Sequence, residues 1–215
     1  MQQGIPADEL RQIELALEQG RQVPPFRGLV AIFWGLILAK CVVLQWVIEY
    51  YTAPVNGWLY IWLPSVVFAG LCTFFYGRLD LLTFKRAPLT GQMARWVWLG
   101  AVGAMLLISI VPLYTDDYSP FVIPALVSVI AGFAFILHGA LEQRRLLIGA
   151  GVCWWGGSLW LFYRPDLTAL PIFAAMILLF QVAPTIHLYL CYRRAEKRQR
   201  VHLQSRAVLD RAAGI

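Results

Sequence analysis

The chain has 215 residues, of which 60% are hydrophobic and 14% are charged, whereas an ordinary soluble domain is roughly 45–50% apolar and about 25% charged. This composition excludes a soluble globular domain, a disordered chain and a disulfide scaffold. The apolar residues form six blocks of about twenty, the length at which an α-helix crosses a hydrocarbon core of ~30 Å. The sequence therefore predicts a polytopic, all-α membrane protein.

Six transmembrane helices are expected, arranged as three hairpins because the connections on one side are very short. Helices are the expected form of each span, since backbone polar groups in lipid must be satisfied within the segment. The predicted spans are Leu29–Tyr50, Trp58–Tyr76, Met93–Tyr114, Ser119–Leu141, Leu146–Tyr163 and Leu167–Tyr192. They define a transmembrane domain over residues 29–192, between a cytoplasmic N-terminal segment, 1–28, and a basic cytoplasmic tail, 193–215.

Basic residues gather on one side of these spans, which sets the predicted orientation. They precede span 1, separate spans 2 and 3 and spans 4 and 5, and follow span 6, while the opposite connections carry mainly acidic residues. By the positive-inside rule both termini are cytoplasmic. The general character of the chain is that of a small protein of a bacterial inner (plasma) membrane, without resemblance to a particular family. The net charge of +6 then reflects orientation and anionic lipid, and it does not indicate nucleic-acid binding.

The two ends of the chain offer different surfaces to partners. Residues 7–19 predict a short amphipathic helix in which Leu10, Ile13 and Leu17 share one face. Its polar face is acidic, so we expect it to dock on protein, either on the chain's own basic loops, on a neighbouring subunit or on another protein, and not on lipid. The basic tail is expected to bind anionic lipids, although its apolar residues leave a protein contact open.

Lys40 is the unusual residue within the spans. It lies about eleven residues into span 1, ~17 Å along the helix and so near the middle of the bilayer, where an ammonium costs about 2.5–3.5 kcal/mol on insertion scales. Every Asp and Glu lies at or beyond a span end, so no buried carboxylate is available to it. Three interpretations remain open. Lys40 bonds Gln181 and carbonyls freed by Pro64 or Pro184, it is buried in neutral form, or it binds an anionic substrate or lipid.

His138 and His187 are expected at similar depths near the inner face, because each precedes a cytoplasmic arginine by six residues. One histidine from each of two helices is an arrangement that clamps haem b. The alternative is that each histidine only bonds a neighbouring helix. A zinc site lacks third and fourth ligands.

The remaining signals concern packing. The four cysteines all lie within spans and are expected to be buried free thiols, while Trp154 and Trp155 lie too deep for an interfacial belt and are expected to pack between helices. Small residues recur every four positions, which lets helices approach closely in lipid, inside the bundle or between copies. These rows are Gly149, Cys153 and Gly157; Gly100 and Ala104; Ser128 and Gly132; and Gly35 and Ala39.

No catalytic or cofactor motif is found in the sequence. The leading hypothesis is therefore a non-catalytic accessory or regulatory subunit that acts by binding a partner or by oligomerising. The first alternative is a small-solute or anion transporter with Lys40, Gln181, Pro64 and Pro184 near the midplane. The second is a haem b electron carrier that uses His138 and His187.

Overall fold

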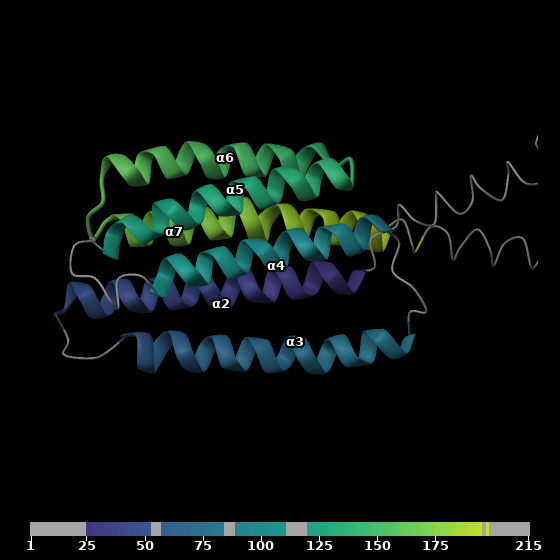
Figure 1. The fold of residues 1–215 in the computed structure, drawn as a ribbon, viewed down its shortest axis with the longest axis horizontal. Coiled ribbons are helices and arrows are strands. Elements are labelled where there is room, and N and C mark those ends of the chain that lie inside the picture. The colour runs from purple at the N-terminus through teal and green to yellow at the C-terminus, as the bar shows by residue number, and fades with distance from the viewer. Residues whose placement is uncertain (1–24, 53–56, 84–88, 111–119, 195–196, 198–215) are drawn as a thin grey trace, which may run out of the picture. The chain divides into compact units, whose positions relative to one another are not determined.

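The computed structural model describes residues 25–52, 57–83, 89–110, 120–194 and 197, and side chains within these ranges except those of 25–27, 58, 76–91 and 120. Every regular element in the described ranges is helical. The predicted helix 7–19, with Leu10, Ile13 and Leu17, and most of the tail 193–215 lie outside the described residues. Successive helices of residues 30–185 run in opposite directions along a common axis, which is horizontal in Figure 1.

The helical elements follow the predicted spans in order. The first half contains α2 (Pro25–Tyr50), the π-helical turn η1 (Trp58–Trp62), α3 (Leu63–Thr83) and α4 (Leu89–Ile110). The second half contains the 3-10 turn η3 (Pro120–Val122), α5 (Ile123–Leu141), α6 (Arg145–Tyr163), α7 (Ala169–Met176) and the π-helical turn η4 (Ile177–Val182). The last helix continues through residues 183–194.

Five of the described helices are long and apolar enough to cross a membrane. Their bounds are Gly28–Tyr50, Gln92–Ile110, Ile123–Leu141, Arg145–Tyr163 and Ala169–Arg194. The second predicted span corresponds to the apolar helix Leu59–Phe75, which is part of a continuous helical segment that runs from η1 to the end of α3 at Thr83. The prediction of an all-helical protein with helices apolar enough to span a membrane is thus confirmed for the described residues.

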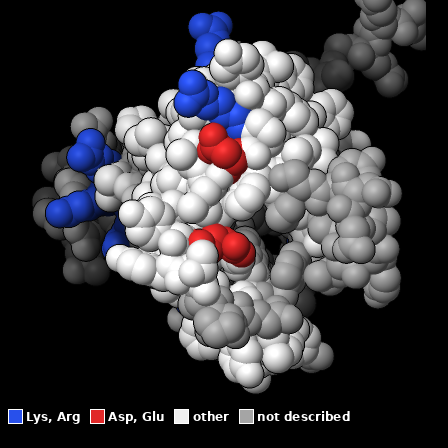
Figure 2. Space-filling view, turned by 90° about the vertical axis from the view of Figure 1, so that its left-hand side faces the viewer, with Lys and Arg blue, Asp and Glu red and all other residues white. Residues whose placement is uncertain are grey.

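The distribution of side-chain size suits a protein surrounded by lipid. Alanine is the commonest buried apolar residue, and large apolar side chains cover the exposed helix faces. Without a hydrophobic drive between helices in lipid, small residues at the contacts allow backbones to approach, and large residues are solvated by acyl chains. In the end-on view of Figure 2, charged side chains form small isolated groups on a surface that is mainly uncharged.

Two compact units are distinguished along the chain, residues 30–185 and the end segments 1–29 with 186–215. The most extensive helix pair of the first unit is α5 with α6, followed by α4 with α5. Glycines bring α5 and α6 together: a Cβ atom at Gly151 would lie 2.6 Å from the carbonyl oxygen of Gly132, and one at Gly132 would lie 2.9 Å from that of Gly151. Real Cβ atoms do not approach backbone so closely, so these two positions require glycine.

The turn between α5 and α6 explains why this pair is so tight. The Arg144 N–H bonds the carbonyl of Gly139 at 2.7 Å, and the Gln143 N–H bonds that of Ala140 at 3.2 Å. Gln143 itself is left-handed, with φ 54°. This is a Schellman ending, which satisfies the last carbonyls of α5 and reverses the chain within three residues.

The predicted rows of small residues lie partly inside the bundle and partly on exposed helix faces. Ser128 and Gly132 are buried in α5, and Gly35 and Ala39 are buried in α2, as expected. On α6, however, Gly149 and Cys153 are exposed. Gly157, the third residue of that row, packs against Met176. The rotation of α6 instead buries a different set of residues: Leu147, Ala150, Gly151, Trp154, Ser158 and Leu161. Gly100 of the remaining row is likewise exposed.

The structure also describes the two deep tryptophans and the cysteines. Trp154 is 1% exposed and stacks edge-on near Phe173, with ring centres 5.9 Å apart. Trp155 is 40% exposed but also packs between α6 and α5, where its indole N–H bonds the Val129 carbonyl at 3.1 Å and its ring lies against Gly132. The four cysteines are free, as predicted, but of these Cys41 is buried, Cys72 is half-buried and the other two are exposed.

Candidate functional site

Lys40 lies on the exposed side of α2, and its ammonium bonds the hydroxyl of Ser65 on α3 at 3.2 Å. Ser65 is 8% exposed. Six residues earlier on α2, the indole N–H of Trp34 donates to the hydroxyl of Thr73 at 2.8 Å. These bonds set the antiparallel register of α2 and α3, with residue 40 opposite residue 65 and residue 34 opposite residue 73.

The predicted partner of Lys40, Gln181, lies elsewhere. Its side chain sits against Gly35, where an added Cβ would lie 3.2 Å from the amide nitrogen. Five residues separate Gly35 from Lys40, which places them about 140° apart around α2 at ~100° per residue. The lysine therefore bonds Ser65 on one side of the helix, while Gln181 packs on another. Sequence reasoning missed Ser65 because a serine next to a proline in a span gives no sign of its partner.

The two prolines of the predicted site each follow a π-helical turn. Pro64 follows η1 by two residues, and Pro184 follows η4 by two residues. A proline lacks the N–H that would bond the carbonyl four residues before it and its ring crowds that carbonyl, so the preceding turn widens. Next to Pro184, the hydroxyl of Thr185 bonds the carbonyl of Gln181 at 2.6 Å. Pro64 is exposed, whereas Gln181 and Pro184 are half-buried.

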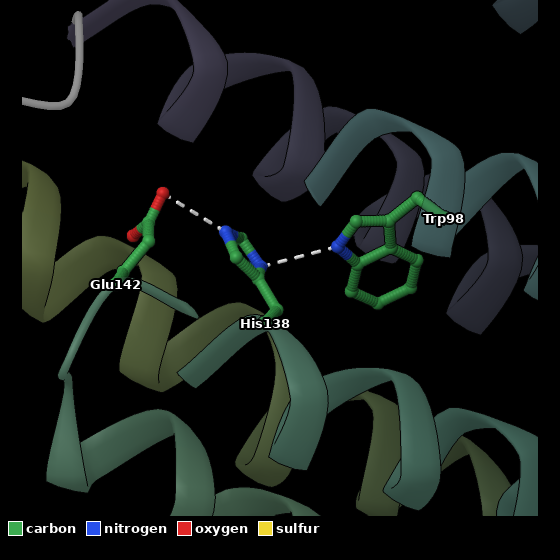
Figure 3. A network of polar contacts seen from close by, with 3 residues as sticks. All are labelled: Trp98, His138 and Glu142. Atoms are coloured by element: carbon green, nitrogen blue, oxygen red, sulfur yellow. Dashed lines mark hydrogen bonds and ion pairs between the residues drawn. The ribbon is translucent and has the colours of Figure 1, made fainter. Parts of the chain in front are cut away.

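His138 belongs to a separate polar cluster at the end of α5 (Figure 3). Its Nδ1 accepts a hydrogen bond from the indole N–H of Trp98 on α4, 3.1 Å away, and its Nε2 lies 3.0 Å from a carboxylate oxygen of Glu142. Because an indole N–H can only donate, Nδ1 must be unprotonated in this arrangement and the ring proton sits on Nε2, facing Glu142. The side chains of His138 and Glu142 are 23% and 12% exposed.

The ring of Trp98 also packs edge-on against Phe135, one turn before His138, with centres 5.1 Å apart. The cluster thereby fixes α4 on α5 by both a hydrogen bond and aromatic contact. Glu142 could have been found from the sequence, since it lies four residues after His138 on a predicted helix. Trp98 could not, because forty residues separate it from the histidine.

His187 belongs to the other compact unit, where it is exposed. Both of its ring nitrogens lie 3.9 Å from the sulfur of Cys191, one turn later. Haem b would need an imidazole nitrogen from each histidine. The haem hypothesis stays a prediction, and it requires His138 to release either Glu142 or Trp98. Among the described residues, no three His, Cys, Asp or Glu side chains are grouped so that they could hold a metal ion.

No protein family, curated protein or solved structure matches the chain. The functional argument therefore depends on the residues themselves.

Proposed function

We propose that this is a six-span inner-membrane protein with both termini in the cytoplasm, and that it serves as a non-catalytic accessory or regulatory subunit by binding a partner. The observation that carries the proposal is the position of Lys40, a cation at mid-helix depth on an exposed helix face. Ionisable residues inside membranes almost always face a bundle interior, a water-filled cavity or an oppositely charged group. An exposed lysine at this depth favours a partner that covers it.

The charges at the helix ends support the proposed topology. Arg95 lies near the start of α4, and Arg144 and Arg145 lie in the turn from α5 to α6. Acidic residues lie at the other ends of the helices. Glu49 lies at the end of α2, and Asp166 lies in the connection before α7. The basic ends are expected to stay in the cytoplasm. The assignment of a sixth span rests on the apolar helix Leu59–Phe75.

The exposed face of α2 around Lys40 offers little that would bind a soluble substrate. The face of α2 next to Lys40 is formed by Leu36, Val43 and Leu44, which are all exposed. These side chains suit another helix or lipid, whereas a transport pathway is lined by polar groups or water. This surface therefore supports partner binding ahead of transport.

Native mass spectrometry of the protein, extracted gently from its own host membrane, tests the proposal. We expect a second polypeptide at fixed stoichiometry. The same measurement on a protein that lacks residues 1–22 shows where the partner docks. A partner that is still retained docks within the membrane, whereas a partner that is lost docks on the predicted N-terminal helix. If the protein emerges as a bare monomer or homo-oligomer under conditions that preserve other assemblies of the same membrane, the subunit proposal is wrong.

One observation favours transport as a second candidate function. The π-helical turn before Pro184 interrupts the last predicted span, and broken helices at mid-membrane depth are common at transporter sites. In a growth assay that depends on uptake by the protein, Gln181→Leu should then lower uptake severalfold, whereas Gln92→Leu, on the exposed side of α4, should not. Unchanged uptake in Gln181→Leu would count against a transport role for this turn.

A further inference from the structure

The depth of Lys40 is set by its place in the first apolar helix. This span runs from Gly28 to Tyr50, so Lys40 lies twelve residues after its start and ten before its end, or ~18 Å and ~15 Å at ~1.5 Å per residue. An ammonium has three donors. Among the described residues, Lys40 has one hydrogen-bond partner, Ser65 at 3.2 Å. Two donors thus remain on an apolar, exposed surface in the middle of the bilayer.

The residues around Lys40 form a face that is suited to a helix. Leu36, Val43 and Leu44 lie at positions −4, +3 and +4 relative to the lysine, so all four side chains share one side of α2. Phe68 of α3, which stacks on Phe33 of α2 with ring centres 6.2 Å apart, is exposed beside this face. A helix laid on this surface would bury apolar side chains around the ammonium.

A second copy of the chain cannot supply the counter-charge. All twelve acidic residues lie at or beyond the ends of the predicted spans. The acidic residue on α2 itself, Glu49, is nine residues from Lys40, which is ~13 Å along the axis. In a membrane, two copies with the same orientation keep each residue at the same depth, so no carboxylate of one copy reaches Lys40 of the other. Any counter-charge for Lys40 therefore comes from a different molecule.

We infer that the face of α2 formed by Leu36, Lys40, Val43 and Leu44 binds a transmembrane helix of a different protein that carries a carboxylate at mid-membrane depth. The inference rests on the proposed subunit function and specifies the partner. Opposite charges within the bilayer are kept there by pairing with one another. An anionic lipid is the less favoured occupant, because its phosphate lies at the membrane surface. The bond to Ser65 instead keeps the Lys40 ammonium near the middle of the membrane.

A synthetic helix tests this surface directly. The full-length protein in neutral phosphatidylcholine vesicles is mixed with a leucine–alanine span of about 21 residues that carries a central Glu, and association is followed by energy transfer between labels. The matched probe carries Gln at the same position. We expect the Glu probe to bind about tenfold more tightly than the Gln probe. Lys40→Met should remove this difference, and Lys40→Arg should keep it because it retains the cation.

Two results would overturn the inference: equal binding of the Glu and Gln probes by the wild-type protein, or a preference for Glu that survives Lys40→Met. Val152→Lys, an exposed position on α6, controls for attraction by any intramembrane cation. Val152→Lys in the Lys40→Met background should restore none of the preference if the shape of the α2 face matters as well as the charge.

Native extraction separates this inference from the proposed function. A polypeptide that is retained by the wild type and Lys40→Arg but lost from Lys40→Met, and whose sequence places Asp or Glu within a span, supports both. A polypeptide retained equally by Lys40→Met leaves the subunit function standing and refutes the α2 face as its binding site. Loss of bound anionic phospholipid from Lys40→Met, with the polypeptide unchanged, would assign the lysine to lipid instead. Absence of any polypeptide refutes the subunit function, and the synthetic helix still decides whether the face selects a carboxylate.

Discussion

The indole N–H of Trp98 determines the tautomer of His138 and at the same time ties α4 to α5. Removing this donor leaves Nδ1 without its partner in a site of low exposure. Hydrogen bonds between helices in membranes contribute about 0.6 kcal/mol on average and up to about 1.7 kcal/mol. Trp98→Phe retains the aromatic contact with Phe135 and therefore isolates the hydrogen bond.

We expect Trp98→Phe to lower the free energy of unfolding by about 1 kcal/mol in detergent titrations. Trp96→Phe is the matched control, because Trp96 is 73% exposed on the same helix. Nitrogen-15 spectra of the wild type should show the His138 ring protonated at Nε2 and unprotonated at Nδ1. A proton on Nδ1 in the folded neutral protein would contradict the assigned geometry.

Asp166 illustrates a local effect outside the membrane. The hydroxyl of Thr168 donates to its carboxylate, and the backbone N–H of Thr168 donates to the same oxygen at 2.8 Å. These two bonds, with a smaller contribution from the charge of Arg164, hold the pKa of Asp166 below its usual value of 3.8. The carboxylate thereby fixes the chain at the entry to α7.

Because the folded pKa is depressed, the stabilisation from Asp166 is present above about pH 3.8 and is lost as the pH falls through the lower, folded pKa. Thr168→Val removes the hydroxyl donor and should raise the pKa of Asp166 part of the way back to 3.8, as measured by carbon-13 titration of the carboxyl group. Thr168→Ser keeps the donor and should leave the titration nearly unchanged. Identical titrations for all three proteins would show that the hydroxyl bond does not form in solution.

The α5–α6 pair is the element whose stability depends most on glycine. A methyl group at position 151 would lie 2.6 Å from the Gly132 carbonyl oxygen and 2.6 Å from a side-chain carbon of Ile136. A position two residues away on the same helix, Gly149, has no atom within 4 Å of an added Cβ. The same substitution at the two sites therefore separates packing from helix propensity.

We predict that Gly151→Ala destabilises the protein by about 1–3 kcal/mol or more, since backbone must move to admit the methyl group. Gly149→Ala should be neutral or stabilising by up to about 1 kcal/mol, because alanine is the better helix former. Both are measured as shifts in unfolding midpoint in detergent. Similar destabilisation by both substitutions would mean that the rotation of α6 described above is wrong.

For the whole molecule, the second predicted span, which contains the apolar helix Leu59–Phe75, decides the topology. An even number of spans places both termini on the same side of the membrane, and an odd number separates them. With six spans, cysteines introduced at Thr52 and Thr168 should react with an impermeant maleimide in intact spheroplasts, and cysteines at Lys85 and Gln143 should react after lysis. The four native cysteines are first replaced by alanine or serine. Cysteines at Thr52 and Lys85 that both react from the same side of the membrane would show that this helix does not cross and would place the N-terminus and the C-terminus on opposite sides.

The sequence alone determined the class of protein, because crossing a membrane depends on the local length and hydrophobicity of each helix. It located the α5–α6 hairpin nearly to the residue, since Arg144 and Arg145 interrupt two apolar runs. It also identified Lys40 as anomalous, because the cost of a charge at that depth does not depend on its neighbours. Glu142 lay within reach of the same reasoning, four residues from His138 on one helix.

Tertiary structure decided which faces meet. The rotation of α6, which buries Gly151 and exposes Gly149, cannot be read from a helix that is apolar on every side. The same holds for the register that sets Lys40 opposite Ser65 and for the approach of Trp98 to His138. Rotation and register are fixed by contacts between distant segments, whereas the apolar pattern of a span specifies only that it lies in lipid.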